Sequence, residues 1–253
     1  MAMTSASGRH LRLVTACTLA ALTAGCATDQ VYRNPNDPWE PFNRVVYQFN
    51  DDFDTVLLKP VAKGYQFITP APVDRGITNF FDNLADVRNG VNNALQFKMT
   101  RAFTSVGRVV VNSTVGVLGF VDVASNLNMP KYNEDFGQTL GTWGVAPGPY
   151  IVLPFLGPST GRDTVGLVGD WYTDPLTYVN DGSVAWGAKA LRIIDRRADL
   201  LAASKVLEAA ALDPYAFVRD GYLQRRRSDI YDGNPPPEEL EEAEVVESGA
   251  LAE

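Results

Sequence analysis

The feature that most constrains the fold is a long stretch, residues 77–95, in which apolar residues recur at helical spacing. The apolar positions are Ile77, Phe80, Phe81, Leu84, Val87, Val91, Ala94 and Leu95. The opposite face carries Asn79, Asp82, Asn83, Asp86, Asn89, Asn92 and Asn93. This period predicts an amphipathic helix whose apolar face lies against a protein core. The alternative is a helix in a membrane interface, but its polar face would carry several Lys and Arg residues, and here only Arg88 is basic.

Further apolar stripes predict that most of the chain is helical. One stripe spans residues 42–57, and another spans about 183–211. Pro214 is placed to open a last helix, whereas Pro60 and the run 69–72 interrupt the chain after the first stripe. No internal repeat is visible. We therefore expect a mostly α protein with one large domain or two small ones.

Residues 103–127 have an ambiguous period. Val, Gly, Ser and Thr dominate, and no charged residue lies between Arg108 and Asp122. The run Val109–Val111 is compatible with a strand. A helix is favoured by the spacing of Phe103, Val106, Val110, Val117 and Val121. Because Asn112 interrupts the stretch, it does not resemble a simple transmembrane helix.

Residues 129–161 are rich in Gly, Pro and aromatic residues. Glycines and prolines are spread through this stretch, among them Gly137, Gly141, Gly144, Gly148, Pro147, Pro149, Pro154 and Pro158. We expect them to prevent any long regular element, leaving a long structured loop or hairpin with an apolar tip region, residues 143–155. Loops of this length in a compact domain are usually functional. After this loop, Thr160 and Asp163 have the spacing of a helix capping box.

The scarcity of histidine and cysteine excludes most enzyme chemistries. The chain has one His and two Cys, and His10, Cys17 and Cys26 all lie in the first 26 residues. If that stretch is processed, no Ser-His-Asp triad, Cys-His dyad, zinc finger or disulfide framework can be built. The run GPSTG, residues 157–161, matches the GxSxG nucleophile elbow, but no histidine remains to activate Ser159. A Ser-Lys pair is the remaining hydrolase alternative, and a turn before a capped helix is the simpler interpretation.

The acidic net charge belongs to the end of the chain. Of the formal charge of −8, residues 232–253 contribute eight acids and no base, whereas residues 26–231 hold 22 acids and 20 bases. This composition predicts a disordered acidic tail and gives no sign of a nucleic-acid interface. The basic run Arg225–Arg227 near the end of the last helix is expected to complement the helix dipole; contact with lipid phosphates is the alternative.

The N-terminus has the pattern of a lipoprotein signal peptide. Basic residues precede an apolar run, residues 13–24, that is shorter than the roughly 20 residues needed to span a bilayer. The run ends in LTAGC, which resembles a bacterial lipobox with Cys26 as the acylated mature N-terminus. An ordinary cleaved signal with a free Cys26 is the alternative. Ala27, rather than Asp, after this cysteine favours the outer membrane, by resemblance to enteric lipoproteins.

Four segments together resemble one protein family. They are DPWEPFNR (37–44), FGQTLGTWGVAPGPYIVLPFLGPSTGRD (136–163), DPLTYV (174–179) and DPYAFVRDGYLQRR (213–226). With these segments the chain is similar to the MlaA (VacJ) family of outer-membrane lipoproteins, over residues 37 to 231. The resemblance implies a ring-like assembly of amphipathic helices with a long Gly/Pro-rich hairpin loop, inserted in one membrane leaflet.

The resemblance also implies a function. An amphipathic channel would remove mislocalised phospholipids from the outer leaflet and pass them to a periplasmic phospholipid-binding carrier of an ABC transport system, maintaining outer-membrane lipid asymmetry. The implied partners are phospholipids, the outer membrane, a trimeric porin and that carrier. A location on the periplasmic side of the outer membrane of a Gram-negative bacterium follows. No enzymatic activity and no cofactor is expected, and the sequence has no GxxxxGK nucleotide loop. The alternative is a structural lipoprotein that binds a porin or the envelope without a transfer channel.

Residues for such a path can be nominated from their chemistry. A lipid track needs apolar walls with small polar groups, and we assign it to Val106, Val109, Val110, Ser113, Thr114, Val117 and Val121. The hairpin beside the channel is assigned to Asn133, Gly137, Gly141, Trp143, Gly144, Gly148 and Phe155. The expected organisation is a signal peptide (1–25), a linker after the lipidated cysteine (26–36), a helical domain (37–231) and the acidic tail (232–253).

Overall fold

A computed structural model of the protein describes residues 34–236, without the side chains of residues 206–210. The chain divides into two compact units, Met1–Pro38 and Trp39–Glu253, and all the described helices and strands belong to the second. The predicted signal peptide, Cys26 and the tail beyond residue 236 lie outside the described residues.

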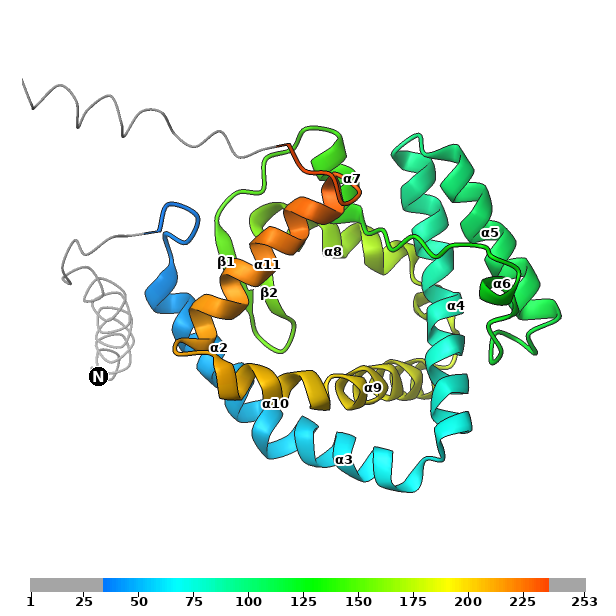
Figure 1. Cartoon of the computed structure of the whole chain (residues 1–253), viewed down its shortest axis with the longest axis horizontal. Coiled ribbons are helices and arrows are strands. Elements are labelled where there is room, and N and C mark those ends of the chain that lie inside the picture. Colours follow the sequence, from blue (N-terminus) through cyan, green and yellow to red (C-terminus); the bar gives the residue numbers. More distant parts are fainter. Residues whose placement is uncertain (1–33, 237–253) are drawn as a thin grey trace, which may run out of the picture. The chain divides into compact units, whose positions relative to one another are not determined.

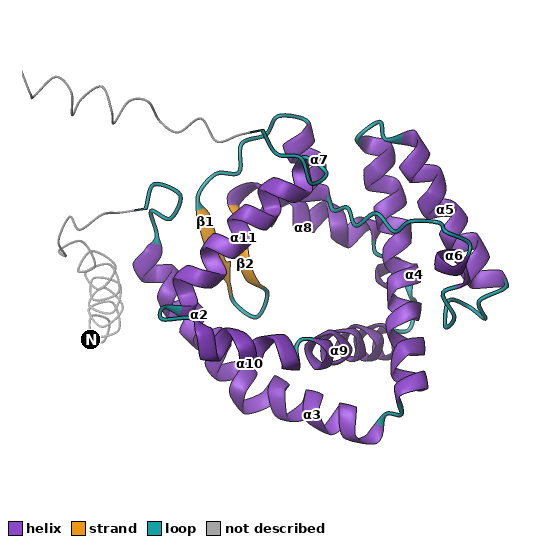
Figure 2. Cartoon of the chain, in the orientation of Figure 1, coloured by secondary structure: helices purple, strands orange, loops and turns teal. Residues whose placement is uncertain are grey.

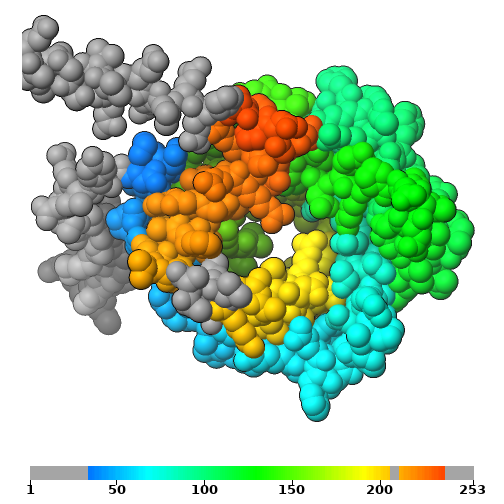
Figure 3. All heavy atoms as spheres, viewed as in Figure 1, coloured from blue at the N-terminus to red at the C-terminus, as the bar shows by residue number. Residues whose placement is uncertain are grey.

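The second unit is mostly helical, as the sequence predicts. In chain order its elements are α2 (Glu40–Phe53), the π-helix η1 (Asp54–Leu58), α3 (Lys59–Ile68), α4 (Ala71–Leu95), α5 (Met99–Thr114), α6 (Val123–Asn126), α7 (Phe136–Thr142), β1 (Tyr150–Leu153), β2 (Gly157–Thr160), α8 (Gly161–Thr173), the 3-10 helix η2 (Pro175–Tyr178), α9 (Gly182–Asp199), α10 (Leu201–Ala210) and α11 (Pro214–Ile230). Within this unit the helices and the hairpin follow one another around a central opening (Figure 1, Figure 2). The space-filling view leaves part of this opening unfilled (Figure 3).

Several helix boundaries follow from local sequence. The Thr160 hydroxyl caps α8 by accepting a hydrogen bond from the Asp163 amide at 3.1 Å, so the predicted capping position is confirmed. Pro214 stands in the first turn of α11, where its missing N–H leaves no bond unmade. The ambiguous stretch that begins at residue 103 is helical up to Thr114, and the strand alternative is wrong.

Two other boundaries differ from the prediction. Pro60 does not interrupt the chain, because α2, η1 and α3 form one continuous run. The π-helix just before it contains a bond from the Lys59 amide to the Asp54 carbonyl, and this widened turn makes room for a proline ring. The single helix predicted for residues 183–211 is divided at Leu200 into α9 and α10.

The long Gly/Pro-rich segment is more ordered than its composition suggests. It contains the short helix α7, which the prediction of no regular element missed. The hairpin is restricted to the antiparallel strands β1 and β2, in which Tyr150 pairs with Thr160 and Leu153 with Gly157. The hairpin is therefore shorter than predicted.

The α4 helix buries its polar face, not its apolar face. The nearly inaccessible polar residues on this helix are Asn83, Asp86, Asn89, Asn92 and Asn93. Of the predicted apolar stripe only Phe81 is buried, and Val91 is exposed. The prediction that this stripe faces a core is therefore wrong. In the described part of the chain, 20 polar or charged residues are buried against 11 apolar ones, the reverse of an ordinary globular interior.

A buried arginine organises this polar interior. The Arg108 side chain, from α5, is only 2% exposed, and its Nε donates to Asp86 Oδ2 at 2.9 Å. Its other nitrogens donate to the Met129 carbonyl at 2.7 Å and to Asp122 Oδ2 at 3.1 Å. Because the buried charges of Arg108 and Asp86 are matched to each other and Asp122 adds a second carboxylate, the network holds α4, α5 and the segment around α6 in one arrangement.

The turn after α5 packs closely against α4. The Gly119 amide donates to the Asn112 carbonyl at 2.8 Å, and a Cβ at Gly119 would lie 2.8 Å from Asn83 Nδ2. Just before it, Val117 and Leu118 take positive φ values of 54° and 58° with their side chains exposed. Such values are strained for β-branched and bulky residues. The close approach to α4 thus determines the path of an exposed apolar turn.

Removing the buried arginine should strongly destabilise the fold. We expect Arg108→Ala to lower the free energy of unfolding by about 3–5 kcal/mol, because Asp86 would be left as a buried, unpaired charge. Urea unfolding of the detergent-solubilised protein, followed by far-UV circular dichroism, measures this. The control is Arg225→Ala, whose side chain is 80% exposed. A loss no larger than that of the control would show that the network contributes little.

Candidate functional site

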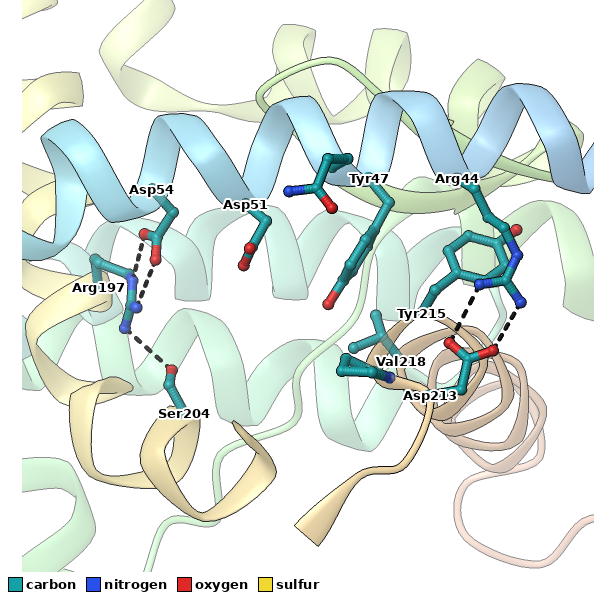
Figure 4. Close-up of a pocket in the computed structure, with 11 residues that line it drawn as sticks. Arg44, Tyr47, Asp51, Asp54, Arg197, Ser204, Asp213, Tyr215 and Val218 are labelled. Carbon is teal, nitrogen blue, oxygen red and sulfur yellow. Dashed lines mark hydrogen bonds and ion pairs between the residues drawn. The ribbon is translucent and has the colours of Figure 1, made fainter. Parts of the chain in front are cut away.

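An amphipathic cavity of about 540 Å³ lies between α2, α9, α10 and α11 (Figure 4). Two ion pairs form part of its wall, one between Arg44 Nη2 and Asp213 Oδ2 at 2.7 Å and one between Arg197 Nε and Asp54 Oδ1 at 2.6 Å. Arg44 also lies over the Tyr215 ring, 4.4 Å from its centroid. The cavity therefore offers neutralised charges beside aromatic surface, and it is large enough for a small molecule or part of a lipid.

A second hollow, between α4 and α5, is almost purely apolar. This groove of about 470 Å³ is lined by Val87, Gly90, Val91, Ala94, Met99, Ala102, Phe103, Val106, Val109 and Val110. Small residues on both helices let the backbones approach closely beneath the groove. Such a surface has affinity for hydrocarbon and offers almost no polar group to a head group or peptide.

The structure divides the predicted lipid track into two parts. Val106, Val109 and Val110 line the apolar groove. Ser113, by contrast, accepts a hydrogen bond from Asn83 Nδ2 at 3.0 Å, and Thr114 donates to the Val110 carbonyl at 2.7 Å. The last two track residues, Val117 and Val121, are exposed on the turn after α5. A role of these seven residues in lipid passage stays a prediction.

The residues assigned to the hairpin are also separated. Gly137 and Gly141 belong to α7, with Asn133 before that helix, so these three are not hairpin residues. A Cβ at Gly137 would lie 2.6 Å from Asp163 Oδ1, so the close packing of α7 against α8 requires glycine at this position.

The other four assigned residues lie nearer to the strands. Trp143 follows α7, and its Nε1 donates to the Leu95 carbonyl at 3.1 Å. Gly144 and Gly148 precede β1 with positive φ values of 88° and 67°. Only Phe155 lies in the turn between the two strands. The assignment is therefore corrected: the hairpin is Tyr150–Thr160.

Two asparagines of α2 hold the hairpin, and neither was predicted from the sequence. Asn43 donates to the Tyr150 carbonyl at 3.0 Å and accepts from the Val152 amide at 2.9 Å. Two helical turns later, Asn50 donates to the Leu153 carbonyl at 3.0 Å and accepts from the Phe155 amide at 2.8 Å. Each amide side chain thus pairs with the backbone as a neighbouring strand would. The i, i+7 spacing of two asparagines on one helix face is the signal that could have revealed this pairing.

The hairpin tip is anchored by aromatic contacts as well. The Phe155 ring makes edge-to-face contacts with Phe49 and Phe53 of α2, at centroid distances of 5.2 and 5.0 Å. Phe155 has a positive φ of 63°, which its packing and hydrogen bond hold in place. The hairpin is therefore attached to α2 through β1 and the turn that holds Phe155.

Arg226 connects α11 to α7 and α8. Its guanidinium lies 2.9 Å from Asp163 Oδ1 and also pairs with Asp135, and Tyr222 donates to Asp163 Oδ2 at 2.8 Å. Burial acts to raise the pKa of both carboxyls, but the bonds and charge of Arg226 outweigh it and lower both pKa values. The expectation that Arg225–Arg227 only complements the helix dipole is therefore wrong for Arg226.

The beginning of the predicted tail also makes specific contacts. Asp232 forms ion pairs with Lys98, at 2.7 Å, and with Arg101 of α5. Since Asp232 is the first of the eight acids assigned to the tail, the ordered chain extends past the predicted boundary at residue 231.

Ser159 is placed as a structural residue. It lies in β2 and is buried, and its hydroxyl contacts the Thr160 carbonyl at 3.2 Å and the Thr164 hydroxyl at 3.0 Å. Neither neighbour is a base. Within residues 34–236 no group of three His, Cys, Asp or Glu side chains could hold a metal ion. Of the helices in the same range, none combines the length and apolar character that crossing a bilayer requires.

The chain is similar to known bacterial lipoproteins. The family profile described as MlaA lipoprotein matches residues 35–229. The intermembrane phospholipid transport system lipoprotein MlaA of Escherichia coli is 35% identical over 245 residues, covering 94% of this chain and 96% of that protein. The protein of the same name from Haemophilus influenzae is 33% identical over 229 residues, covering 87% and 91%. A structure described as "Structural basis for maintenance of bacterial outer membrane lipid asymmetry" contains a chain with 33% identity and a TM-score of 0.68, covering 80% of this chain and 100% of that one.

Loss of one α2 asparagine should loosen the hairpin locally. In Asn50→Ala the Phe155 amide loses its acceptor, so we expect its hydrogen exchange to accelerate about tenfold or more, as a bond of about 1.4 kcal/mol would require. Exchange followed by mass spectrometry of peptides covering residues 150–160 measures this. Gln48→Ala is the matched control, because Gln48 bonds only locally, to Asp52. Equal exchange in both variants would contradict the role of Asn50.

Proposed function

Because the chain belongs to the MlaA lipoprotein family, we propose that it removes mislocalised phospholipids from the outer leaflet of the outer membrane and passes them to a periplasmic carrier. The single observation that carries this proposal is the reversed distribution of polarity. Polar side chains of α4 are buried within the unit that surrounds the opening, whereas apolar side chains of α4 and α5 are exposed. A surface of this kind is stable against hydrocarbon, and the opening that the unit surrounds offers a passage that a head group could use.

The physical problem of lipid transfer explains what such a protein must supply. A head group that crosses hydrocarbon unaided costs several kcal/mol or more. Acyl chains that enter water cost about 0.8 kcal/mol per CH₂ group. A path with a polar side and an apolar side lowers both barriers without breaking a covalent bond, so it needs no nucleophile and no group that titrates near pH 7. For this reason we propose that the chain is not an enzyme.

The apolar groove is the part of the surface best suited to acyl chains. Val106, Val109 and Val110 of the predicted track line it, and we propose that they guide a chain during transfer. The Ser113 hydroxyl accepts a hydrogen bond from Asn83 of α4, and the Thr114 hydroxyl donates within α5, so both support the helices that carry the track. The hairpin, with Phe155 at its tip, would border the path.

The remaining parts of the proposal concern location and partners. The chain would be attached to the periplasmic side of the outer membrane through acyl groups on Cys26, beside a trimeric porin. Its carrier would belong to an ABC transport system, and since the sequence has no nucleotide loop, flow through this protein would be downhill or drawn by the carrier. A structural lipoprotein without a path is less favoured, since such a protein has no need for a central opening.

Deletion of the gene tests the function directly. We expect phospholipid in the outer leaflet to increase by several-fold and the wild-type gene to reverse the increase. Val106→Glu should fail to reverse it, because a carboxylate in the groove repels hydrocarbon. Val165→Glu, at a similarly exposed valine of α8 outside the groove, is the matched control. No increase after deletion would contradict the function, and equal behaviour of the two variants would contradict the groove as part of the path.

Lipid attachment has its own test. Cys26→Ala should abolish incorporation of radioactive palmitate and release the protein from the membrane fraction over time, since acyl chains supply the anchor. Cys17→Ala should label as the wild type does. Persistent label in Cys26→Ala would overturn the assignment.

A further inference from the structure

Three arginines of α4 and α9 lie close together near the C-terminal end of α8, where Arg88 approaches Asp170 and Arg192 pairs with Asp174. Arg88 comes from α4, and Arg192 and Arg196 come from α9. α4 packs against both α8 and α9, and all three helices border the opening (Figure 1). Like charges in one place are unfavourable unless carboxylates neutralise them, so the counter-charges decide what this cluster can do.

Arg196 makes no direct ion pair within the described part of the chain, and Asp82 and Asp174 act on its charge only from a distance. Among the side chains that the structure describes, none forms a hydrogen bond or ion pair with its guanidinium, although the side chain is accessible to solvent. The surrounding protein desolvates it, and the charges of Arg192 and Arg88 repel it, so that its pKa is lowered from the usual arginine value.

Arg88 is only weakly neutralised. Its Nε is buried without a hydrogen-bond partner, and it lies 3.9 Å from Asp170 Oδ1, outside hydrogen-bond distance. Asp170 already accepts a bond from the Phe136 amide at 3.0 Å. Burial raises the pKa of Asp170 to about 6, so this carboxyl is ionised at neutral pH but becomes protonated as the pH falls below about 6.

The other acids nearby are engaged elsewhere. Asp174 pairs with Arg192 at 2.7 Å, and Asp82 pairs with Lys131. Asp195 accepts hydrogen bonds from Tyr65 at 2.9 Å and from Thr78 at 3.2 Å. The cluster therefore has excess positive charge at Arg88 and Arg196. A partly buried guanidinium without a partner is unfavourable, and an incoming anion relieves this.

We propose that Arg88 and Arg196 bind the phosphate of a phospholipid as it passes through the opening. This inference rests on the proposed function, since that function brings phospholipid to this place. A phosphodiester suits the pair, because guanidinium groups bind phosphate oxygens through two parallel hydrogen bonds. The site would bind the phosphate and would make no contact that depends on the head-group alcohol. It would therefore accept zwitterionic and anionic glycerophospholipids alike.

Binding of two matched fluorescent lipids to the purified full chain in detergent tests the proposal. One probe is a short-chain phosphatidylglycerol, and the other is the diacylglycerol with the same chains and no phosphate. In Arg88→Gln/Arg196→Gln we expect the dissociation constant for phosphatidylglycerol to rise about tenfold or more and that for diacylglycerol to stay unchanged. Arg225→Gln, at an exposed arginine of α11 that is not part of the cluster, should match the wild type for both probes.

The single variant Arg196→Gln tests the proposal even if the double variant does not fold. Because Arg196 makes no ion pair with a described side chain, its replacement removes no internal bond, and a threefold or larger loss of phosphatidylglycerol affinity would support the proposal even if the double variant unfolds. Arg196→Lys should recover part of that loss. Unchanged phosphatidylglycerol affinity in folded variants would overturn the arginine assignment and leave the proposed function standing.

Two further outcomes distinguish a lipid site from a site for free phosphate and test the proposed function itself. If the wild type binds neither probe, the proposed function itself fails. If inorganic phosphate displaces phosphatidylglycerol at the same concentration as a soluble phosphatidylglycerol competitor does, the cluster is a site for free anions, and the assignment to a lipid head group is overturned.

Discussion

The structure depends on the burial of the polar face of α4. Side-chain amides and carboxylates on that face bond across to three other parts of the chain. Asp86 pairs with Arg108, the Asn89 side chain accepts from the Glu134 amide at 3.1 Å, and the Asn92 side chain accepts from the Thr139 hydroxyl at 2.8 Å. In a low-dielectric interior such groups are costly when left without partners, so their bonds determine one arrangement of α4, α5 and α7.

Burying polar groups inside forces apolar groups outward. Apart from Phe81, the apolar residues of α4 are not buried, and Val87, Val91 and Ala94 line a groove together with residues of α5. In water this distribution would favour aggregation, whereas against hydrocarbon it is stable. The same choice leaves room for polar and charged side chains on the inner helices. The burial of the polar face of α4 thus explains why the outer surface formed by α4 and α5 is apolar.

The sequence predicted the contacts between residues that are near each other in the chain, and it did not reveal those between residues that are far apart. The α8 cap at Thr160 and the start of α11 at Pro214 were predictable, since the residues that make each contact are at most three positions apart. The period of α4 was predictable, but which face is buried depends on the medium around the protein, and a periodic pattern does not contain that information. The asparagines of α2 were missed because their backbone partners are more than 100 residues away. For Arg226, the local pattern suggested a helix-end charge, and its partners Asp135 and Asp163 are 91 and 63 residues away.

The amphipathic cavity and the arginine cluster differ in how their positive charges are neutralised. In the amphipathic cavity Arg44 and Arg197 are paired with carboxylates at 2.7 and 2.6 Å, so an anionic ligand would have to displace a strong partner there. In the arginine cluster of α4 and α9, Arg196 has no bonding partner among the described side chains. Arg88 Nε lies 3.9 Å from Asp170 Oδ1, which is too far for a hydrogen bond, so an anion would not have to displace a bonded carboxylate. A path must bind its cargo well enough to admit it and weakly enough to release it. The proposed pair would meet both requirements, because a phosphate would gain guanidinium contacts on entry and the Asp170 carboxylate, 3.9 Å from Arg88, would compete for that arginine when the phosphate leaves.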